Sequence, residues 1–267
     1  MGKRLHFISG LPRSGSTLLA AVLRQNLNAC AGISSPVAEI FSTVLQTMSS
    51  SDLASQISDG QRLEILRSVV LGYYRSADHR LVFDTSRSWC GKLPALVQLF
   101  PDTRVICCVR TPAWIVDSVE RLVQRNPLRA PRMFGYDVHG TVFSRAQAMA
   151  GKGVFLQAAL QGLRQAWFGE FADRLIVVRY ESFVDSPERV VRALYEALGE
   201  PYFDHDFDNV QFDAADFDEA WLPGLHAVRG PIRARPRRSI LPPEVFGQLS
   251  ECFWDDPQQN PMGVTIL

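Results

Sequence analysis

The stretch from Phe7 to Leu19, FISGLPRSGSTLL, is the strongest local signal in the sequence and indicates a binding loop. An apolar strand is followed by a turn of small residues, and then by a helix that begins near Thr17. In such a turn the backbone N–H groups at the helix N-terminus form a cradle for an anion. Gly10 and Gly15 have the spacing of the two glycines of a P-loop, but Ser16 stands where that loop has its lysine. The stretch therefore predicts a turn between a strand and a helix that resembles a P-loop but lacks the positive charge of its lysine.

The missing lysine bears on the chemistry. In P-loop enzymes that lysine reaches the β- and γ-phosphates of ATP or GTP, so a kinase or hydrolase without it loses a main cationic contact. A donor that has no γ-phosphate does not need the contact at this place. Arg13, on the other side of the turn, can supply positive charge instead. A P-loop kinase or NTPase with an unusual loop, and a non-catalytic nucleotide-binding module, stay open as alternatives.

Short apolar runs alternate with helical patterns along most of the chain. The runs have the composition of strands that are buried on both faces, and they are Leu5–Ser9, Arg80–Asp84, Arg104–Val109 and Leu175–Tyr180. The helical patterns are Thr17–Leu27, Gln61–Tyr74, Lys92–Phe100, Pro112–Val123, Ala146–Phe171, Pro187–Leu198 and Pro242–Phe253. This alternation predicts an α/β fold with a doubly wound parallel sheet. We expect residues 1–267 to form a single domain whose proline-rich last third wraps the edge of the site.

Composition excludes several classes of protein. Lys plus Arg and Asp plus Glu both number 28, so there is no basic excess for a nucleic-acid partner. The five cysteines have no CxxC spacing and no Cys/His cluster accompanies them, which predicts free thiols, no metal site and a reducing compartment. No run reaches the ~18 apolar residues of a membrane span, and no signal peptide is evident. We expect a cytoplasmic protein; its oligomeric state is open, with a homodimer as one alternative.

Residues 11–18, LPRSGSTL, resemble the 5'-phosphosulfate-binding loop of the sulfotransferase superfamily. The match is to the P-R-S-G-[ST]-T-L form of the tyrosylprotein sulfotransferase branch and of many bacterial sulfotransferases. The resemblance implies the sulfotransferase fold, 3'-phosphoadenylyl sulfate (PAPS) as the donor and 3',5'-adenosine bisphosphate (PAP) as the product, with no metal required. The loop residues that would hold the donor are Arg13, Ser14, Gly15, Ser16 and Thr17.

A second stretch, Leu99–Arg110, continues into a helix that carries Ser118. It resembles the family's 3'-phosphate site, where an arginine at a strand end and a serine eight residues later clasp the phosphate. Arg110 would emerge at the carboxyl end of a central strand, where α/β sheets bind ligands. A planar guanidinium also suits a phosphate dianion. The alternative is an ordinary helix start with a surface serine.

Two weaker elements complete the resemblance. The segment Arg179–Val184 resembles the family's stretch in which a tyrosine contacts the nucleotide, so Tyr180 is a candidate, although Phe183 replaces the usual leucine. The arginine-rich stretch from 229 to 238 resembles the loop that presents cations to the 3'-phosphate. Arg229 and Arg238 are the two candidates within it.

Sulfuryl transfer by in-line displacement has a loose transition state, so positioning and cations dominate its catalysis. Arg13 is the expected stabiliser of developing charge, and a general base must take the acceptor proton. In the tyrosylprotein branch the base is a glutamate after the first helix, a position near Ser34 here. Glu39 follows five residues later and is one candidate. Its alternative role is that of a first-turn acid complementing a helix dipole.

The end of the second predicted strand offers other catalytic candidates. Asp84 is an alternative base at the carboxyl end of that strand. Many relatives have a lysine and a proline just after it, where Thr85 and Ser86 stand here. Arg87 is therefore a candidate to replace the lysine, and its alternative role is that of a solvated loop residue.

The remaining candidates are lone histidines and the acceptor pocket. His139 and His226 lie in loop-like surroundings, and His226 is of more interest because the arginine-rich stretch follows it. The acceptor, a hydroxyl or amine of a small molecule or a peptide, is not identified by the sequence. We expect the pocket for it to be shaped by the segments Ser34–Ser51, Asn126–Ser144 and Phe203–Pro223.

Overall fold

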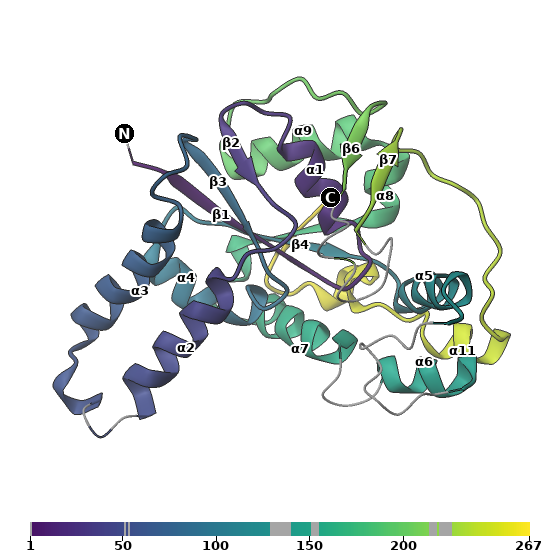
Figure 1. The fold of residues 1–267 in the computed structure, drawn as a ribbon, viewed down its shortest axis with the longest axis horizontal. Helices are drawn as coiled ribbons and strands as arrows, with labels where there is room; N and C mark the ends of the chain where they lie inside the picture. The colour runs from purple at the N-terminus through teal and green to yellow at the C-terminus, as the bar shows by residue number, and fades with distance from the viewer. Residues whose placement is uncertain are drawn as a thin grey trace.

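The structure is a computed structural model, and it describes residues 2–50, 52, 54–128, 140–150, 155–213, 218 and 226–267. In these residues six strands form one sheet in the order β2-β3-β1-β4-β5-β8, and all its pairings are parallel (Figure 1). In that order the strands are Ala29–Ala31, Leu81–Thr85, Arg4–Gly10, Val105–Val109, Leu175–Arg179 and Thr265–Ile266. The predicted α/β fold with a parallel sheet is confirmed.

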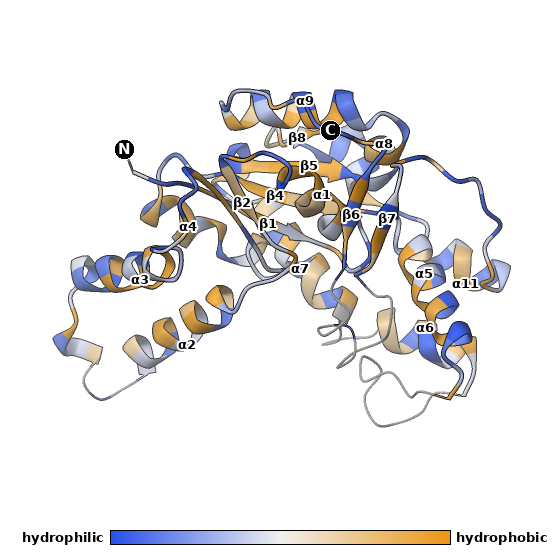
Figure 2. Cartoon of the chain, turned by 45° about the horizontal axis from the view of Figure 1, so that its top comes forward, coloured by the Kyte–Doolittle hydropathy of each residue, from blue (hydrophilic) through white to orange (hydrophobic). Residues whose placement is uncertain are grey.

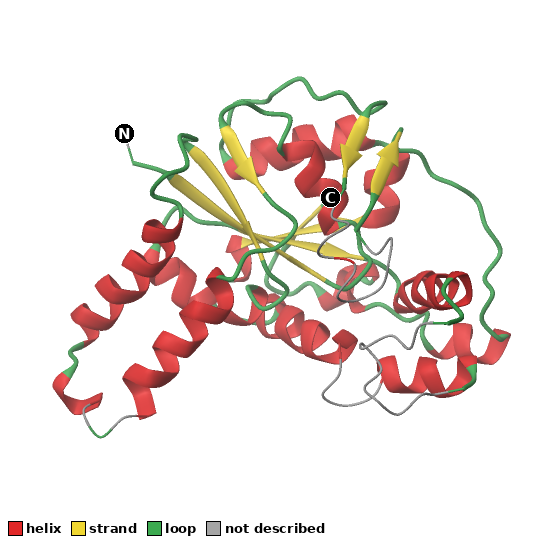
Figure 3. Ribbon diagram, viewed as in Figure 1, coloured by secondary structure: helices red, strands yellow, loops and turns green. Residues whose placement is uncertain are grey.

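Two apolar layers cover the two faces of this sheet. Along β1, Leu5 and Phe7 belong to one core, whereas Ile8 belongs to the other, because successive side chains of a strand point to opposite faces. The first core takes in residues of α2 (Val37–Ser50), α3 (Asp59–Tyr73), α4 (Leu93–Leu99), α5 (Pro112–Arg125), α6 (Val142–Ala150), α7 (Phe155–Trp167) and α11 (Pro243–Gln248). The second takes in residues of α1 (Ser16–Leu23), α8 (Tyr180–Asp185) and α9 (Pro187–Leu198). Figure 3 shows the resulting helix–sheet–helix arrangement.

The helix α9 has the predicted bounds, Pro187–Leu198. Proline begins its first turn, and Gly199 ends it with a φ of 65°, the left-handed conformation that glycine adopts without strain. Ser186 precedes this proline and has a residue type typical of helix caps, but its side chain does not cap the helix; its hydroxyl donates to Asp185 Oδ2 at 3.1 Å instead.

Two predicted helices differ from the structure. The pattern over 146–171 corresponds to the separate helices α6 and α7, and residues 151–154 between them lie outside the described residues. The pattern over 242–253 yields only α11, which ends at Gln248. The chain leaves helical geometry there because Phe253 and Trp254 turn into the core, where they are 9% and 4% exposed. Tertiary packing overrides a local helical pattern here.

The sequence analysis missed the helix α2 and the shortest strands. The edge strands β2 and β8 have three and two residues, too few to show a period. In the last third, β6 (Val210–Phe212) pairs antiparallel with β7 (Val228–Gly230). From β7 the chain runs in extended form along the side of the molecule to α11 (Figure 1). We call this stretch, residues 231–241, the strap.

Short 3-10 turns complete the fold: η1 (Ala54–Gln56), η2 (Cys90–Lys92), η4 (Ala172–Arg174), η5 (Phe253–Asp255) and η6 (Pro257–Gln259). The helices α2 and α3 lie side by side and project away from the sheet, while apolar residues concentrate in the sheet and on the helix faces against it (Figure 2). Within the described part of the chain, no helix is both long and apolar enough to cross a membrane.

Candidate functional site

The site lies where the strand order reverses around β1. The chain leaves β1 to build β2 and β3 on one side, and then builds β4 on the other. In doubly wound sheets ligands bind at this switch point, outside the carboxyl ends of the strands. Residues 10–17, which we call the glycine loop, follow β1, and Arg110 follows β4. The two are joined by hydrogen bonds from Leu11 N to Cys108 O at 2.9 Å and from Arg110 Nη1 to Arg13 O at 3.4 Å.

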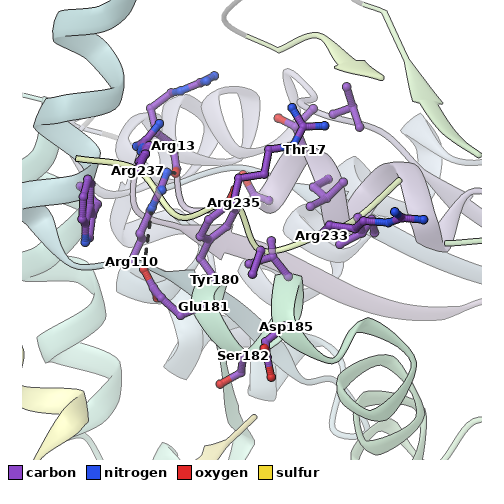
Figure 4. Close-up of a pocket in the computed structure, with 18 of the residues that line it drawn as sticks. Arg13, Thr17, Arg110, Tyr180, Glu181, Ser182, Asp185, Arg233, Arg235 and Arg237 are labelled. Carbon is purple, nitrogen blue, oxygen red and sulfur yellow. Dashed lines mark hydrogen bonds and ion pairs between the residues drawn. The ribbon is translucent and has the colours of Figure 1, made fainter. Parts of the chain in front are cut away.

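A cavity of about 1140 Å³ opens at this point. Its walls are built from the glycine loop, α5, α8, Arg87, His226, β7 and the strap. Figure 4 shows part of this lining. Such a volume lies slightly above the usual range of small-ligand pockets, about 300–1,000 Å³.

The glycine loop has a fixed shape. Ser14 is buried, and its hydroxyl donates toward the carbonyl oxygens of Leu11 and Cys108, at 2.6 and 2.7 Å. Gly15 has a φ of 95°, and a Cβ added there would lie 2.9 Å from Tyr180 Cδ2. Both constraints turn the start of α1 toward the cavity, where the first N–H groups of a helix have no acceptor within the helix. Ser16 and Thr17 line the cavity, whereas the Ser14 hydroxyl is committed to the backbone.

Arg13 lies at the bend of the loop with a φ of 57°, which is unusual for a residue other than glycine. Its Nε donates to Ser118 Oγ at 3.2 Å, so the loop and α5 are joined at this point. Burial and the nearby charge of Arg110 lower the pKa of Arg13 to about 10. The guanidinium is still charged at neutral pH. Two cations held this close together favour an anion between them.

Arg110 is stacked on Tyr180, with its guanidinium carbon 4.1 Å from the ring centroid. Its Nε lies 3.8 Å from Glu181 Oε1 (Figure 4), and this buried atom makes no hydrogen bond within the described residues. Burial lowers the pKa of Arg110. A buried guanidinium N–H without an acceptor is costly, and an anionic ligand would satisfy it. Ser118, the expected partner of Arg110, instead contacts Arg13 and is not among the described residues that line the cavity.

The strap supplies arginines to the wall of the cavity that faces the glycine loop. Of the two candidates from the sequence, Arg229 lines the cavity and Arg238 does not. Arg229, on β7, lines the cavity, but its side chain is 79% exposed and pairs with Asp213 at 3.1 Å. Arg238 is exposed and does not line the cavity; its carbonyl oxygen accepts from Arg121 Nη2 at 2.5 Å. The strap arginines that line the cavity are Arg233, Arg235 and Arg237.

The spacing of these three arginines is the signal that the sequence analysis missed. Arg233, Arg235 and Arg237 alternate with Ala234 and Pro236 along the extended chain, and the two smaller residues line the cavity as well. Figure 4 shows Arg235 above Tyr180, and Arg237 beside Arg13 and Arg110.

Asp117 on α5 anchors the strap. One of its carboxylate oxygens accepts from Ser239 Oγ at 3.0 Å and from the Ile240 N–H at 2.8 Å. The other lies 2.9 Å from Arg121 Nε and 3.1 Å from Arg237 Nη2. Burial alone would raise the pKa of Asp117, but these donors outweigh it and hold the pKa below its usual value. Arg237 also packs on the Trp114 ring, at 5.2 Å from its centroid. No local sequence pattern marks Asp117 for this role.

Two candidates for the general base do not lie in the cavity wall. Glu39 is exposed in the first turn of α2, which fits its alternative role as a first-turn acid. It is not among the described residues that line the cavity. Asp84 is fully buried and accepts three hydrogen bonds of 2.5–2.6 Å, from Ser35 Oγ, Tyr74 Oη and Trp89 Nε1. Burial raises the pKa of this carboxyl group. The network fixes the start of the loop that carries Arg87 and does not present Asp84 to a substrate.

Arg87 and His226 do line the cavity. The Arg87 carbonyl accepts from Ser9 Oγ at 2.9 Å, and burial lowers the pKa of its guanidinium to about 10. His226 contacts Asp218, with its Nδ1 at 2.6 Å from Asp218 Oδ1. The other lone histidine, His139, lies outside the described residues. Among the residues that the structure places, no group of three or more His, Cys, Asp and Glu side chains could hold a metal ion.

Comparison with known proteins identifies the family. A family model described as the sulfotransferase family matches residues 6–204, so the chain belongs to that family. The sulfotransferase domain of the Synechococcus PCC 7002 olefin synthase has a similar fold, at 18% sequence identity, 96% coverage of each chain and a TM-score of 0.55. A sulfotransferase from Alicyclobacillus acidocaldarius aligns at 16% identity over 82% of this chain and 90% of that one, with a TM-score of 0.49. No curated protein matches the sequence.

Proposed function

We propose that this chain transfers the sulfuryl group of PAPS to a hydroxyl or amine of a small-molecule or peptide acceptor. The observation that carries the proposal is the meeting of the glycine loop with Arg110 at the switch point of the sheet. There, two guanidinium groups with lowered pKa and the N-terminus of α1 converge on one cavity. Membership of the sulfotransferase family supports this choice over a kinase or an NTPase.

The proposed donor site divides between the two phosphate-bearing ends of the nucleotide. The glycine loop binds the 5'-phosphosulfate through the first N–H groups of α1 and through Ser16 and Thr17, which line the cavity. Arg110 binds the 3'-phosphate, since its Nε is buried without a hydrogen-bond acceptor. The Tyr180 ring stacks against the Arg110 guanidinium and stabilises its position. Arg237 approaches from the strap.

In the proposed reaction the acceptor attacks sulfur in line with the bridging oxygen, and that oxygen leaves with PAP. Negative charge grows on the departing oxygen, so fixed cations close to it lower the barrier. Arg13 and Arg87 are the lining cations on the two loops that follow β1 and β3, and we assign this stabilisation to them. The mechanism assigns no step to a metal ion.

A cytoplasmic location is part of the same proposal. All five cysteines are free thiols, as the reducing cytoplasm would keep them.

Ligand-induced stabilisation tests the donor site. PAP at about 100 times its dissociation constant should raise the free energy of unfolding by ~2.7 kcal/mol, whereas ATP-Mg at the same concentration should raise it far less. Stabilisation by ATP-Mg alone would favour the NTPase alternative. Production of PAP from PAPS by the purified protein then tests transfer itself.

The variant Arg110→Ala tests the assignment of the 3'-phosphate. A charge-assisted hydrogen bond contributes about 1.5–3 kcal/mol, so PAP affinity should fall roughly 10- to 150-fold. Adenosine 5'-phosphosulfate, which lacks the 3'-phosphate, should bind the variant and the unmodified protein alike. Arg238→Ala is the matched control, because Arg238 does not line the cavity. Equal weakening of both nucleotides by Arg110→Ala would show that the assignment is wrong.

A further inference from the structure

Sulfuryl transfer to an alcohol needs a group that removes the acceptor proton, and neither Glu39 nor Asp84 lines the cavity in which the proposed function places the reaction. The wall does contain a second kind of proton acceptor. His226 precedes β7 and lines the cavity together with the glycine loop and Arg87. The following argument rests on the proposed function.

Asp218 fixes His226 at two points. One carboxylate oxygen accepts the His226 backbone N–H at 2.8 Å, and the other lies 2.6 Å from the ring Nδ1. Both side chains are largely buried, with 4% of Asp218 and 15% of His226 exposed. A carboxylate at this distance holds the ring proton on Nδ1, which leaves Nε2 as the basic nitrogen. The ring therefore has one tautomer and one orientation, which are the requirements for a general base.

The surroundings of the ring lower the pKa of His226, and burial is the largest cause. Burial lowers the pKa of His226, Asp218 raises it, and the cations Arg13 and Arg87 lower it further, so that the net pKa lies below the usual value of 6.5. Arg13 belongs to the glycine loop and Arg87 to the loop after β3. His226 lines the same cavity as the two cations to which we assign charge stabilisation.

We propose that His226, oriented by Asp218, is the general base of the transfer. The Nε2 atom takes the proton of the acceptor hydroxyl while the acceptor oxygen forms a bond to sulfur and the bond from sulfur to the bridging oxygen breaks. PAP leaves with that oxygen and with the electron pair of the broken bond. The imidazolium then returns its proton to water. Asp218 is a positioning residue, because it acts only through the ring.

This assignment has a consequence for acceptors. An aliphatic alcohol holds its proton tightly and depends on the base, whereas 4-nitrophenol is partly ionised at neutral pH and depends far less on a proton acceptor. The loss caused by removing the base must therefore be large for the first class of acceptor and small for the second. A residue with a merely structural role would affect both classes equally.

The test compares His226→Gln, Asp218→Asn and a matched control, His79→Gln, in the intact chain. His79 lies two residues before β3 and is not among the described residues that line the cavity. PAP formation from PAPS is measured with water alone, with 2-phenylethanol and with 4-nitrophenol. His226→Gln should lower the rate with water and with 2-phenylethanol about 100- to 10,000-fold, and should leave the rate with 4-nitrophenol within a few-fold. His79→Gln should match the unmodified protein throughout.

The pH profile of the rate distinguishes a positioning role of Asp218 from a merely structural one. Without substitution, the rate with water should fall on the acid side of pH 6.5 as His226 becomes protonated. The Asp218→Asn variant loses the carboxylate that raises the pKa of the ring, so its acid limb should move to lower pH while its maximal rate falls. An unchanged limb in this variant would overturn the role of Asp218. A maximal rate unaffected by His226→Gln would overturn the base.

Two controls keep this proposal distinct from the proposed function. In the first control, PAP must stabilise all variants as it stabilises the unmodified protein. If the unmodified protein does not bind PAP, or does not turn over PAPS, the result counts against the proposed function itself. Nitrogen NMR of the His226 ring supplies a measurement that needs no turnover. It should find the proton on Nδ1 at neutral pH, and a ring protonated on Nε2 would overturn the proposal.

Discussion

The cavity has two walls that differ in how they are built. On one side the glycine loop is joined to the sheet by the Leu11 N–H and by the buried hydroxyl of Ser14. On the other side the strap presents exposed arginines and is held to the body of the protein by side-chain contacts with Asp117. The first wall is part of the backbone architecture, whereas Asp117 makes several of the contacts that hold the second.

This difference predicts a division of labour in ligand binding. Contacts made by a preorganised wall cost little further ordering, so they should supply most of the affinity for the nucleotide. The strap arginines keep more water and more rotamer freedom, and ions in solution screen them. Their contribution should therefore be smaller and should fall as salt is added. Each substitution below tests one wall against the other.

The largest expected effect on donor affinity belongs to the glycine loop. Gly15 and Gly230 both have positive φ, 95° and 86°, but an added Cβ meets Tyr180 at 2.9 Å in the first case and open space in the second. Gly15→Ala and Gly230→Ala should each destabilise the fold by about 1–3 kcal/mol through backbone strain. Only Gly15→Ala should also lower PAP affinity, by more than tenfold, because Tyr180 supports Arg110.

Calorimetric titration with PAP and thermal unfolding of the two variants measure both quantities. Equal affinity losses would show that the two walls do not differ in the way proposed. No loss in either variant would show that the shape of the glycine loop is unimportant for the nucleotide.

The next effect belongs to the anchor of the strap. Asp117→Asn keeps the shape of the side chain but removes the charge that faces Arg121 and Arg237. We expect a loss of about 1–3 kcal/mol in the free energy of unfolding and faster cleavage of residues 231–241 by trypsin. PAP affinity should fall only a few-fold, since the first wall remains. A loss of affinity as large as that of Gly15→Ala would refute the division of labour.

The pH dependence of this anchor has a definite sign. The pKa of Asp117 is lower in the folded protein than its usual value, 3.8, so the folded state binds fewer protons than the unfolded state as the pH falls. The stabilisation is therefore fully present above that value and is lost as pH falls through the lower, folded pKa. In Asp117→Asn this acid-dependent part of the stability should be missing, which unfolding curves between pH 5 and pH 2 would reveal.

The contrast between the glycine loop and the strap also explains which parts of the site the sequence could predict. The glycine loop combines a strand, two glycines and a helix start within thirteen residues, 7–19, so its conformation and its place in the sheet follow from local rules. The role of the strap depends on contacts between residues more than a hundred positions apart, such as Asp117 with Ser239. Local patterns carry no information about such pairs. The sequence alone therefore could not show that Arg237, and not the candidate Arg238, lines the cavity.

The catalytic candidates follow the same division. Asp84 was correctly placed at the end of its strand, but the sequence could not reveal that Tyr74 and Trp89 turn inward to surround it. The sequence marks His226 only as a lone histidine before the arginine-rich stretch, because its partner, Asp218, belongs to no recognisable motif. Spacing predicts where a backbone goes, whereas the partners of a buried polar side chain are set by the packing of distant segments.

The smallest expected effect distinguishes two arginines of the second wall. Arg229 pairs with Asp213 at the surface and is 79% exposed, whereas Arg237 packs on Trp114 and contacts Asp117. Arg237→Ala should weaken PAP binding a few-fold at low ionic strength, and the difference should shrink as salt rises, because partly exposed charges are screened. Arg229→Ala should leave the affinity within a factor of two, since an exposed pair contributes only about 0–1 kcal/mol. Titrations with PAP at low and high salt measure both. If Arg229→Ala proves the more harmful, the wall that binds the nucleotide extends along β7, and the strap is then not its second half.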